Sequence, residues 1–344
     1  MAGARFIALF LVLAGWLSIL PAGASLYVGE ADIEPTGKSA RPPILDALNQ
    51  VLVRLTGRAD EDLVAKLGID SAQANSLSLG RQFRSASVIG PDGDAFEQRR
   101  LRVDFDPAAV NDLLERADLP RWGGERPELL LWIVDDGPRG ARYLGDDAVI
   151  DHALDRASFR YGFEFARPIL DASDRIEVTP ADIRGGFTSA AADAVRRYGA
   201  DGVVMLDLRQ SDAYWTGRWA WRINDFESTF ERSGSNPQEV IELGLGRIAG
   251  ALAARFAVRS DAPVLRRLVV SGVSSVNHYT EVSGFLRRLT GVDQVRLLAA
   301  DGQSLTFELR TSADGLRQRI ELTGPLQFER HDLSAGTLYY RLAW

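Results

Sequence analysis

The sequence predicts an α+β fold of three small α/β-type domains, in which two βαββα-like modules flank a central α/β sheet domain. Proline-bearing joints at 120–127 and 259–263 interrupt the hydrophobic pattern. Strand-like and helix-like stretches alternate between the joints, and one short motif occurs twice. We therefore expect the following parts: a leader at 1–24, an N-terminal βαββα module at 25–120, the central α/β domain at 127–258, and a ferredoxin-like βαββαβ module at 264–344.

The N-terminal module begins with a predicted strand and a helix. The helix follows Pro42-Pro43, because proline is tolerated in the first turn, where backbone N–H groups have no intrahelical partner. Its apolar residues recur with a period of about 3.6, and Gly57 stands where a helix-terminating glycine belongs. Two hairpin strands at 82–89 and 99–105 and a helix after Pro107 complete the order β-α-β-β-α.

The C-terminal region repeats this order. A strand, a helix, a hairpin and a second helix are followed by two closing strands around Gln327 and Tyr339. The segment Leu52–Gly57 matches Leu286–Gly291 at five of six positions, and both segments end a predicted helix. We infer a repeated module, although an amphipathic helix end that arose twice would give the same match.

The central region shows a different pattern. A continuous apolar run at Leu129–Val134 predicts a strand that is covered on both faces, and Val203–Leu208 predicts a second. Trp215–Ile223 and Phe226–Arg232 form a predicted hairpin, and Asn236 starts a long helix with the spacing of a capping box. Helical patterns between the strands indicate an α/β layer.

The first 24 residues have the order of a secretory signal, with a charged start, an apolar stretch and then small residues. Ala22 and Ala24 fit a signal peptidase site, so we expect cleavage after Ala24 and a periplasmic location. The alternative is an uncleaved inner-membrane anchor, although the apolar stretch is shorter than the roughly 20 residues of a span. No later segment is long and apolar enough to cross a bilayer, so we expect no transmembrane segment after signal removal.

Composition and motifs argue against several kinds of function. The chain has no cysteine and a formal net charge of −7, which excludes thiolate sites and disfavours nucleic acid. Gly37-Lys38-Ser39 resembles part of a phosphate loop, but Asp32 stands where that loop needs a glycine and Pro35 removes an N–H donor. Gly244–Gly250 lies inside the predicted long helix, so close helix packing explains it better than dinucleotide binding. We expect no nucleotide and no cofactor.

No compact catalytic or metal-binding motif is present. The three histidines, His152, His278 and His331, share no helical turn, and there is no G-x-S-x-G to nominate a serine nucleophile. We therefore predict neither a metal site nor catalytic residues, and a chain that is not an enzyme.

An acidic cluster follows the first buried strand of the central domain. Its members are Asp135, Asp136, Asp146, Asp147 and Asp151. Ligands collect beyond the carboxyl ends of strands in open α/β sheets, and hard cations prefer oxygen ligands. We interpret the cluster as a solvated acidic loop, with cation binding as the alternative.

The most distinctive local feature is a row of tryptophans. On a strand, Trp215, Trp219 and Trp221 share one face, while Arg218 and Arg222 share the other. The row either packs beneath the helix that begins after Asn236 or forms a recognition surface, since tryptophan and arginine dominate binding hot spots. These five residues are the candidate binding residues of the sequence.

Four segments are informative in combination: VLVRLTGR at 51–58, the stretch Leu101–Gly123, LLLWIVDD at 129–136 and YGADGVVMLDL at 198–208. Together they resemble the bacterial family named domain of unknown function 2066. Its members are exported proteins of Gram-negative bacteria without an assigned activity, so the resemblance implies a location and no functional residues. The central domain also resembles the small α/β domains of periplasmic accessory proteins.

These observations predict a periplasmic envelope protein that binds another protein as an adaptor or accessory factor. The alternative is a carbohydrate- or peptidoglycan-binding protein that uses the Trp-rich hairpin. The third hypothesis is an enzyme with a dispersed acid/base site, which no motif supports.

Overall fold

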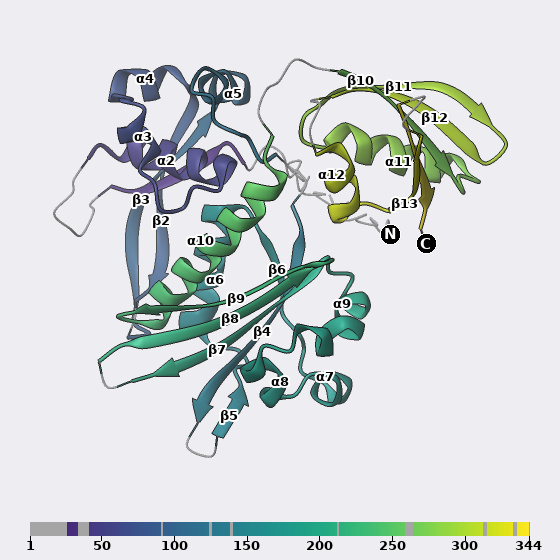
Figure 1. The fold of residues 1–344 in the computed structure, drawn as a ribbon. Helices are drawn as coiled ribbons and strands as arrows, with labels where there is room; N and C mark the ends of the chain where they lie inside the picture. The colour runs from purple at the N-terminus through teal and green to yellow at the C-terminus, as the bar shows by residue number, and fades with distance from the viewer. Residues whose placement is uncertain are drawn as a thin grey trace, which may run out of the picture.

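The computed structural model (Figure 1) describes residues 26–33, 41–90, 92–123, 126–137, 140–211, 213–258, 264–311, 315–332 and 336–343. The leader with Ala22 and Ala24, the Gly37-Lys38-Ser39 segment and the joint at 259–263 lie outside these residues. The described part contains three sheets with helices packed against them, so the predicted α+β fold is confirmed. None of the helices in this part is both long and apolar enough to cross a membrane.

The N-terminal module has a three-stranded antiparallel sheet in the order β1-β3-β2. Two short helices that the sequence pattern did not predict begin at Asp62 and Asp70, whose carboxylates accept backbone N–H groups of the first turn. The hairpin strands are longer than predicted, because their outer residues are polar and exposed and lack an apolar pattern. The elements are β1 (Val28–Asp32), α2 (Pro43–Thr56), α3 (Leu63–Lys66), α4 (Ser71–Ser76), β2 (Ser78–Ile89), β3 (Ala95–Phe105) and α5 (Pro107–Arg116).

Helix α2 forms where its sequence signals predict. Pro43 occupies the first turn, and the apolar stripe of the helix is buried against β1 and β3. Gly57 ends the helix in the left-handed conformation (φ 70°), and its N–H donates to the carbonyl of Val53 at 2.7 Å. A side chain at Gly57 would also collide with Ala253 of another helix, which brings the two helices into direct contact.

The central domain has a mixed sheet in the order β5-β4-β7-β8-β9, with β6 beside the first half of β4. Strands β4 and β7 are parallel, and β7, β8 and β9 are antiparallel. Helices α6 and α10 cover one face, and α8 and α9 cover the other. The elements are β4 (Glu128–Gly137), β5 (Gly140–Tyr143), α6 (Ala148–Tyr161), β6 (Glu164–Ala166), α7 (Ala172–Glu177), α8 (Pro180–Gly185), η1 (Thr188–Ala191), α9 (Ala192–Tyr198), β7 (Gly202–Gln210), β8 (Trp215–Ile223), β9 (Phe226–Gly234) and α10 (Pro237–Phe256).

The C-terminal module has a five-stranded sheet in the order β11-β12-β10-β14-β13. As in the N-terminal module, the first strand lies beside the third and the second lies outside it. Its end differs from a ferredoxin-like βαββαβ unit, because the closing strands pair with each other and β14 lies parallel to β10. The elements are β10 (Val264–Ser271), α11 (Val276–Arg288), β11 (Val292–Asp301), β12 (Ser304–Thr311), α12 (Leu316–Thr323), β13 (Leu326–Asp332) and β14 (Thr337–Leu342).

The N-terminal module and the central domain share one continuous hydrophobic core, whereas the C-terminal module has a core of its own and adds Leu322 of α12 to the shared one. Figure 1 shows α10 between the N-terminal module and the central sheet. The joint at 120–127, which the sequence pattern predicts to be a linker, is part of this shared core: Trp122 is buried and Arg121 pairs with Val258 through their backbones. Residues 26–258 therefore pack as one unit with two sheets.

Candidate functional site

The Trp-rich hairpin belongs to the core and does not form a recognition surface. Trp219 and Trp221 have exposures of 0% and 1%, and they pack beneath α10. Trp219 stacks on Phe230, and Trp221 meets Phe226 edge to face. A side chain at Gly244 of α10 would lie 2.1 Å from the Trp219 ring, so helix and strand are in close contact. The glycines of α10 therefore serve packing, as the sequence predicts, and the two tryptophans cannot stack on a ligand.

The two arginines of the hairpin lie on the opposite face of β8, as the alternation predicts. Arg218 is half-buried and donates to the carbonyl of Arg184 in the last turn of α8 at 3.0 Å. Arg222 is also half-buried. The five predicted binding residues are thus divided between two faces of one sheet, and only Trp215 is both aromatic and partly accessible.

Trp215 lies at the edge of a cavity of about 440 Å³ at the carboxyl ends of β4 and β7. After β4 the chain crosses to β6, which lies on one side of β4, and then crosses back to β7, which lies on the other side of β4. The direction in which strands are added to the sheet therefore reverses between β4 and β7. Such a reversal is where open α/β sheets form a ligand crevice. The lining residues are Asp92, Asp135, Leu144, Asp147, Val149, Ile150, Leu208, Gln210, Trp215, Ser235, Asn236 and Pro237.

The carboxylates of this crevice have structural partners. Asp135 forms a two-point ion pair with Arg142, at 2.8 and 2.9 Å. Asp147 caps α6 by accepting the N–H groups of Val149 and Ile150. Of the acidic residues predicted to cluster, Asp135 and Asp147 line the crevice, and Asp151 pairs with Arg167. Within the described residues, no group of three or more His, Cys, Asp or Glu side chains is arranged to hold a metal ion.

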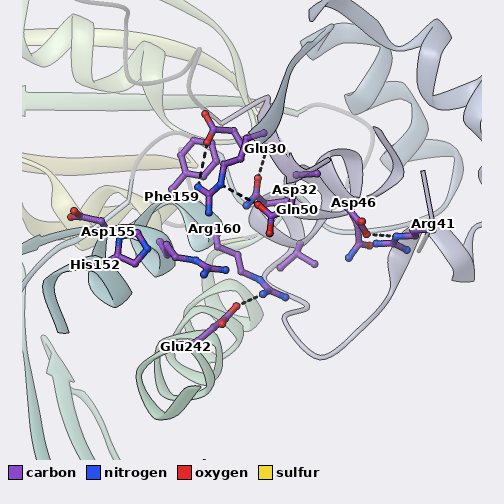
Figure 2. A pocket seen from close by; sticks show the side chains of 15 residues that line it. Glu30, Asp32, Arg41, Asp46, Gln50, His152, Asp155, Phe159, Arg160 and Glu242 are labelled. Carbon is purple, nitrogen blue, oxygen red and sulfur yellow. Dashed lines mark hydrogen bonds and ion pairs between the residues drawn. The ribbon is translucent and has the colours of Figure 1, made fainter. Parts of the chain in front are cut away.

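A second cavity, of about 410 Å³, lies where the N-terminal sheet meets α6 and α10 (Figure 2). Acidic and basic side chains line much of it, and several of them form ion pairs. Figure 2 shows Arg41 bonded to Asp46 at one end and Arg160 bonded to Glu242 at the other. The Arg41–Asp46 pair is local to the start of α2, whereas the Arg160–Glu242 pair ties α6 to α10.

The inner wall of this second cavity is built around Glu30 of β1. Its carboxylate is 3.2 Å from Arg102, 3.6 Å from Arg84 and 3.9 Å from Arg100, and Arg100 also pairs with Asp32 at 3.1 Å. Three guanidinium groups therefore hold the carboxylates of this wall in ion pairs. Such an arrangement ties the three strands of the N-terminal sheet together and leaves neither Glu30 nor Asp32 free to act as a base.

His152 of α6 lines the same cavity. Burial and, second, the nearby charges of Arg156 and Arg100 lower the pKa of this imidazole from its ordinary value. Its Nε2 atom is buried and has no hydrogen-bond partner within the described residues. The imidazole is therefore neutral near pH 7, and no described nucleophile or metal is positioned by it.

Two arginines with inward-facing guanidinium groups lie near this cavity: Arg54 is buried and Arg126 is half-buried. Arg126 donates to four backbone carbonyls, those of Gly123, Tyr161, Arg54 and Trp122, and lies 4.1 Å from the centroid of the Trp122 ring. Burial and, second, repulsion from Arg54 lower the pKa of Arg126 to about 9. The carbonyls belong to the ends of α2 and α6 and to the joint, so one side chain connects three segments.

Arg54 connects α2 to the start of β1 and to α6. It donates to the carbonyls of Leu26 and Val28 at 3.1 and 2.7 Å, and it lies over the ring of Phe159. Burial lowers the pKa of Arg54 to about 10, against the opposing effect of Glu30. The sequence analysis did not identify either arginine as an interior residue. The available signals were that Arg54 stands within the apolar stripe of a helix and that Arg126 stands close to Trp122 in the sequence.

Strand β2 is the most exposed element of the N-terminal sheet. It is an edge strand of 12 residues, and Leu79 and Phe83 on it have exposures of 70% and 71%. Phe83 pairs across the sheet with the buried Leu101, so it points to the same face as the core but lies beyond the cover of α2. Sequence reasoning assigned the strand but not its exposure, since its alternating apolar residues resemble those of a half-buried strand.

Comparison with protein families identifies one matching region. Residues 24–123 match the family model of a domain of unknown function, DUF8605. The match covers the N-terminal module and ends at Gly123, in the joint that carries Trp122. The expected membership of the family named domain of unknown function 2066 is therefore wrong, and the location it implied loses that support. Comparison with curated proteins and with solved structures finds no significant match.

Proposed function

We propose that the chain is an exported protein of the cell envelope that binds another protein as an adaptor or accessory factor and catalyses no reaction. Support for export comes from the order of charged, apolar and small residues at 1–24, with Ala22 and Ala24 at the predicted cleavage site. Support for binding comes from the edges of the sheets.

The observation that carries the proposal is the state of these edges. Each of the three sheets ends in a long strand whose outer side pairs with no other strand within the described residues: β2, β9 and β11 have 12, 9 and 10 residues. On β2 the last residue, Ile89, accepts a hydrogen bond from the Gln238 side chain at 2.9 Å, and the stretch before it remains open. Such an edge presents a row of free N–H and C=O groups, to which an extended segment of another chain can pair. An adaptor of several small sheets offers several places of this kind.

The use of the charged groups supports binding rather than catalysis. In the crevice, Asp135 is held by Arg142 and Asp147 caps a helix. In the second cavity, Glu30 and Asp32 are held by arginines. A general acid or base needs a carboxyl group free to exchange a proton with substrate, and these four are committed to structural contacts.

Export is tested by fractionation and mass measurement. We expect the protein in the osmotic-shock fraction, with a mass that lacks residues 1–24. A protein that stays with the inner membrane and keeps those residues would support the anchored alternative. A protein that remains in the cytoplasm would overturn the export half of the proposal.

Binding is tested by photo-cross-linking in intact cells, since the sequence contains only two lysines, Lys38 and Lys66, for amine-reactive reagents. A photo-reactive residue is placed in turn on β2, β9 and β11, and at Ile176 of α7 as the control, which is 80% exposed and lies on no sheet edge. We expect at least one edge to yield a protein that the control position does not. A turnover reaction abolished by Asp135→Asn would instead show an enzyme.

A further inference from the structure

The three open edges differ in how they are protected against pairing. In β9, phenylalanines that pack beneath α10 alternate with exposed polar residues, among them Glu227 and Glu231. In β11, two register shifts interrupt the pairing with β12. Charges and bulges are the usual means by which an edge is kept from pairing with other chains.

Strand β2 has the least protection. Its pairing with β3 is regular from Gly80 to Ile89, with a single register shift before Gly80. It contains neither proline nor an acidic residue, and all side chains from Arg81 to Ser85 are exposed. Leu79 and Phe83 are more exposed than Leu297 and Leu298 of β11, which reach 40% and 39%. A long, regular and apolar edge left open is a place where another strand adds.

The charges around this edge indicate what kind of strand adds. The face that carries Phe83 also carries Arg81 and Arg99, both exposed and without an ion-pair partner in the described part of the chain. Arg84 on the other face is 3.6 Å from Glu30, which it shares with two other arginines. The edge is therefore basic in a protein whose net charge is −7.

A second copy of the chain fits this edge poorly. Antiparallel pairing of two β2 strands would bring Arg81 and Arg84 of both copies to the same short stretch of ladder, with no carboxylate on either strand. Like charges that face each other across a ladder destabilise it, whereas opposite charges contribute about 0.2–1 kcal/mol per pair. A segment that places an acid opposite Arg81, apolar residues on the same face over Leu79 and Phe83, and an acid on the other face near Arg84 satisfies both the charges and the apolar side chains.

We propose that the outer edge of β2 receives an extended, acidic segment of the partner protein as an added strand, with an acid facing Arg81 and apolar side chains packed on Leu79 and Phe83. This inference rests on the proposed function, because it requires a protein partner. It adds to that function the site, the backbone geometry and the chemistry of the segment that is bound.

The test uses the full-length exported protein with a photo-reactive residue in place of Phe83, and with Ile176 as the control position. The cross-linked segment of the partner is identified by mass spectrometry, and the partner is then purified. Hydrogen exchange of the β2 amides and the affinity of the complex are measured for the wild type and for the variants Arg81→Glu and Phe83→Ser. Arg196→Glu, at an exposed arginine of α9, is the matched control for the change of charge.

We expect a cross-link from position 83 to a segment rich in Asp or Glu, and slower exchange of β2 amides in the complex. We expect the dissociation constant to rise at least tenfold in Arg81→Glu and in Phe83→Ser and to stay within twofold in Arg196→Glu. Both changed side chains on β2 are exposed, so the variants should unfold at the wild-type temperature, which is measured alongside.

The contrary outcomes separate this inference from the proposed function. A partner that cross-links only from β9 or β11, with β2 amides unchanged, overturns the β2 site and leaves protein binding intact. A partner segment at position 83 without acidic residues overturns the charge argument. Protection of β2 in the purified chain alone, with a doubled mass in light scattering, would assign the edge to a second copy. A chain without a partner from any position overturns both proposals.

Discussion

Replacement of Arg126 with methionine tests whether this buried guanidinium joins the N-terminal module to the central domain. In the wild type it donates to the carbonyls of Tyr161 and Arg54 at 2.8 and 2.6 Å, and to those of Gly123 and Trp122 at 3.2 and 3.1 Å. Methionine keeps the apolar stem of the side chain but leaves these four carbonyls without that donor.

The size of the effect follows from opposing contributions. The two shortest bonds alone, at about 1.5–3 kcal/mol each for a charged donor, correspond to about 3–6 kcal/mol. Methionine also removes the desolvation of the guanidinium, the same burial that lowers the pKa of Arg126 to about 9, and this offsets part of the loss. We expect the free energy of unfolding of the unit formed by residues 26–258 to fall by about 3 kcal/mol and its Tm by about 6–12 °C.

The measurement is urea and thermal unfolding followed by circular dichroism. Arg255→Met is the control, since Arg255 lies exposed over the ring of Phe226 and donates no comparable set of bonds. We expect the control to unfold almost as the wild type does. An Arg126→Met protein as stable as the wild type, or more stable, would refute the reasoning, because the burial of the charge would then outweigh the four hydrogen bonds.

Three further predictions concern the core and the crevice. Gly244→Ala should lower the free energy of unfolding by about 1–3 kcal/mol, because its Cβ would collide with Trp219. Gly284→Ala is the control, because Gly284 also lies within a helix but its Cβ would meet only the flexible end of the Arg288 side chain. We expect this variant to leave the urea midpoint unchanged or to raise it. Burial raises the pKa of Tyr161 from 10.0 to about 12, so the unfolded state ionises first. The stability that Tyr161 contributes is complete below pH 10 and is lost as the pH rises to 12. Urea unfolding measured across this range should show that the free energy of unfolding of the wild type falls by about 2–3 kcal/mol more than that of Tyr161→Phe. Trp215→Ala should leave sedimentation with peptidoglycan sacculi unchanged; a loss of co-sedimentation would favour the carbohydrate alternative.

The fold could be predicted from the sequence wherever one element supplied its own signal. The apolar run of β4, the prolines that open α2 and α10, and the glycine after α2 are local features, and each has the predicted place. The repeated L-x-R-L-T-G segment ends a helix in both modules, with Gly57 and Gly291 in the left-handed conformation. The arginine of the first copy is buried and that of the second is exposed, so the motif did not determine its own surroundings.

What the sequence could not supply was the arrangement of the elements around one another. Whether Trp219 is core or surface depends on α10, whose closest residue, Gly244, lies 25 positions away along the chain. The joint at 120–127 resembles a linker because proline and glycine flank it, yet Trp122 is buried by residues from both sides of the joint. Strand β2 is exposed because α2 packs on β1 and β3 and does not extend over β2. The hydrophobic periodicity of β2 alone cannot show how far a helix elsewhere in the chain extends.

The shared core of residues 26–258 also sets the order in which the chain can acquire its structure. Synthesis proceeds from the N-terminus, so α2 is complete long before α10, the helix that Gly57 contacts through Ala253. The apolar surface of the first module must remain uncovered until the chain has been made as far as residue 256. The C-terminal module closes its core within residues 264–343, apart from Leu322, which packs in the shared core, and so has little such delay. The first three-quarters of the chain therefore carries the greater hazard of premature association, and a factor that holds nascent or unfolded chains would act there.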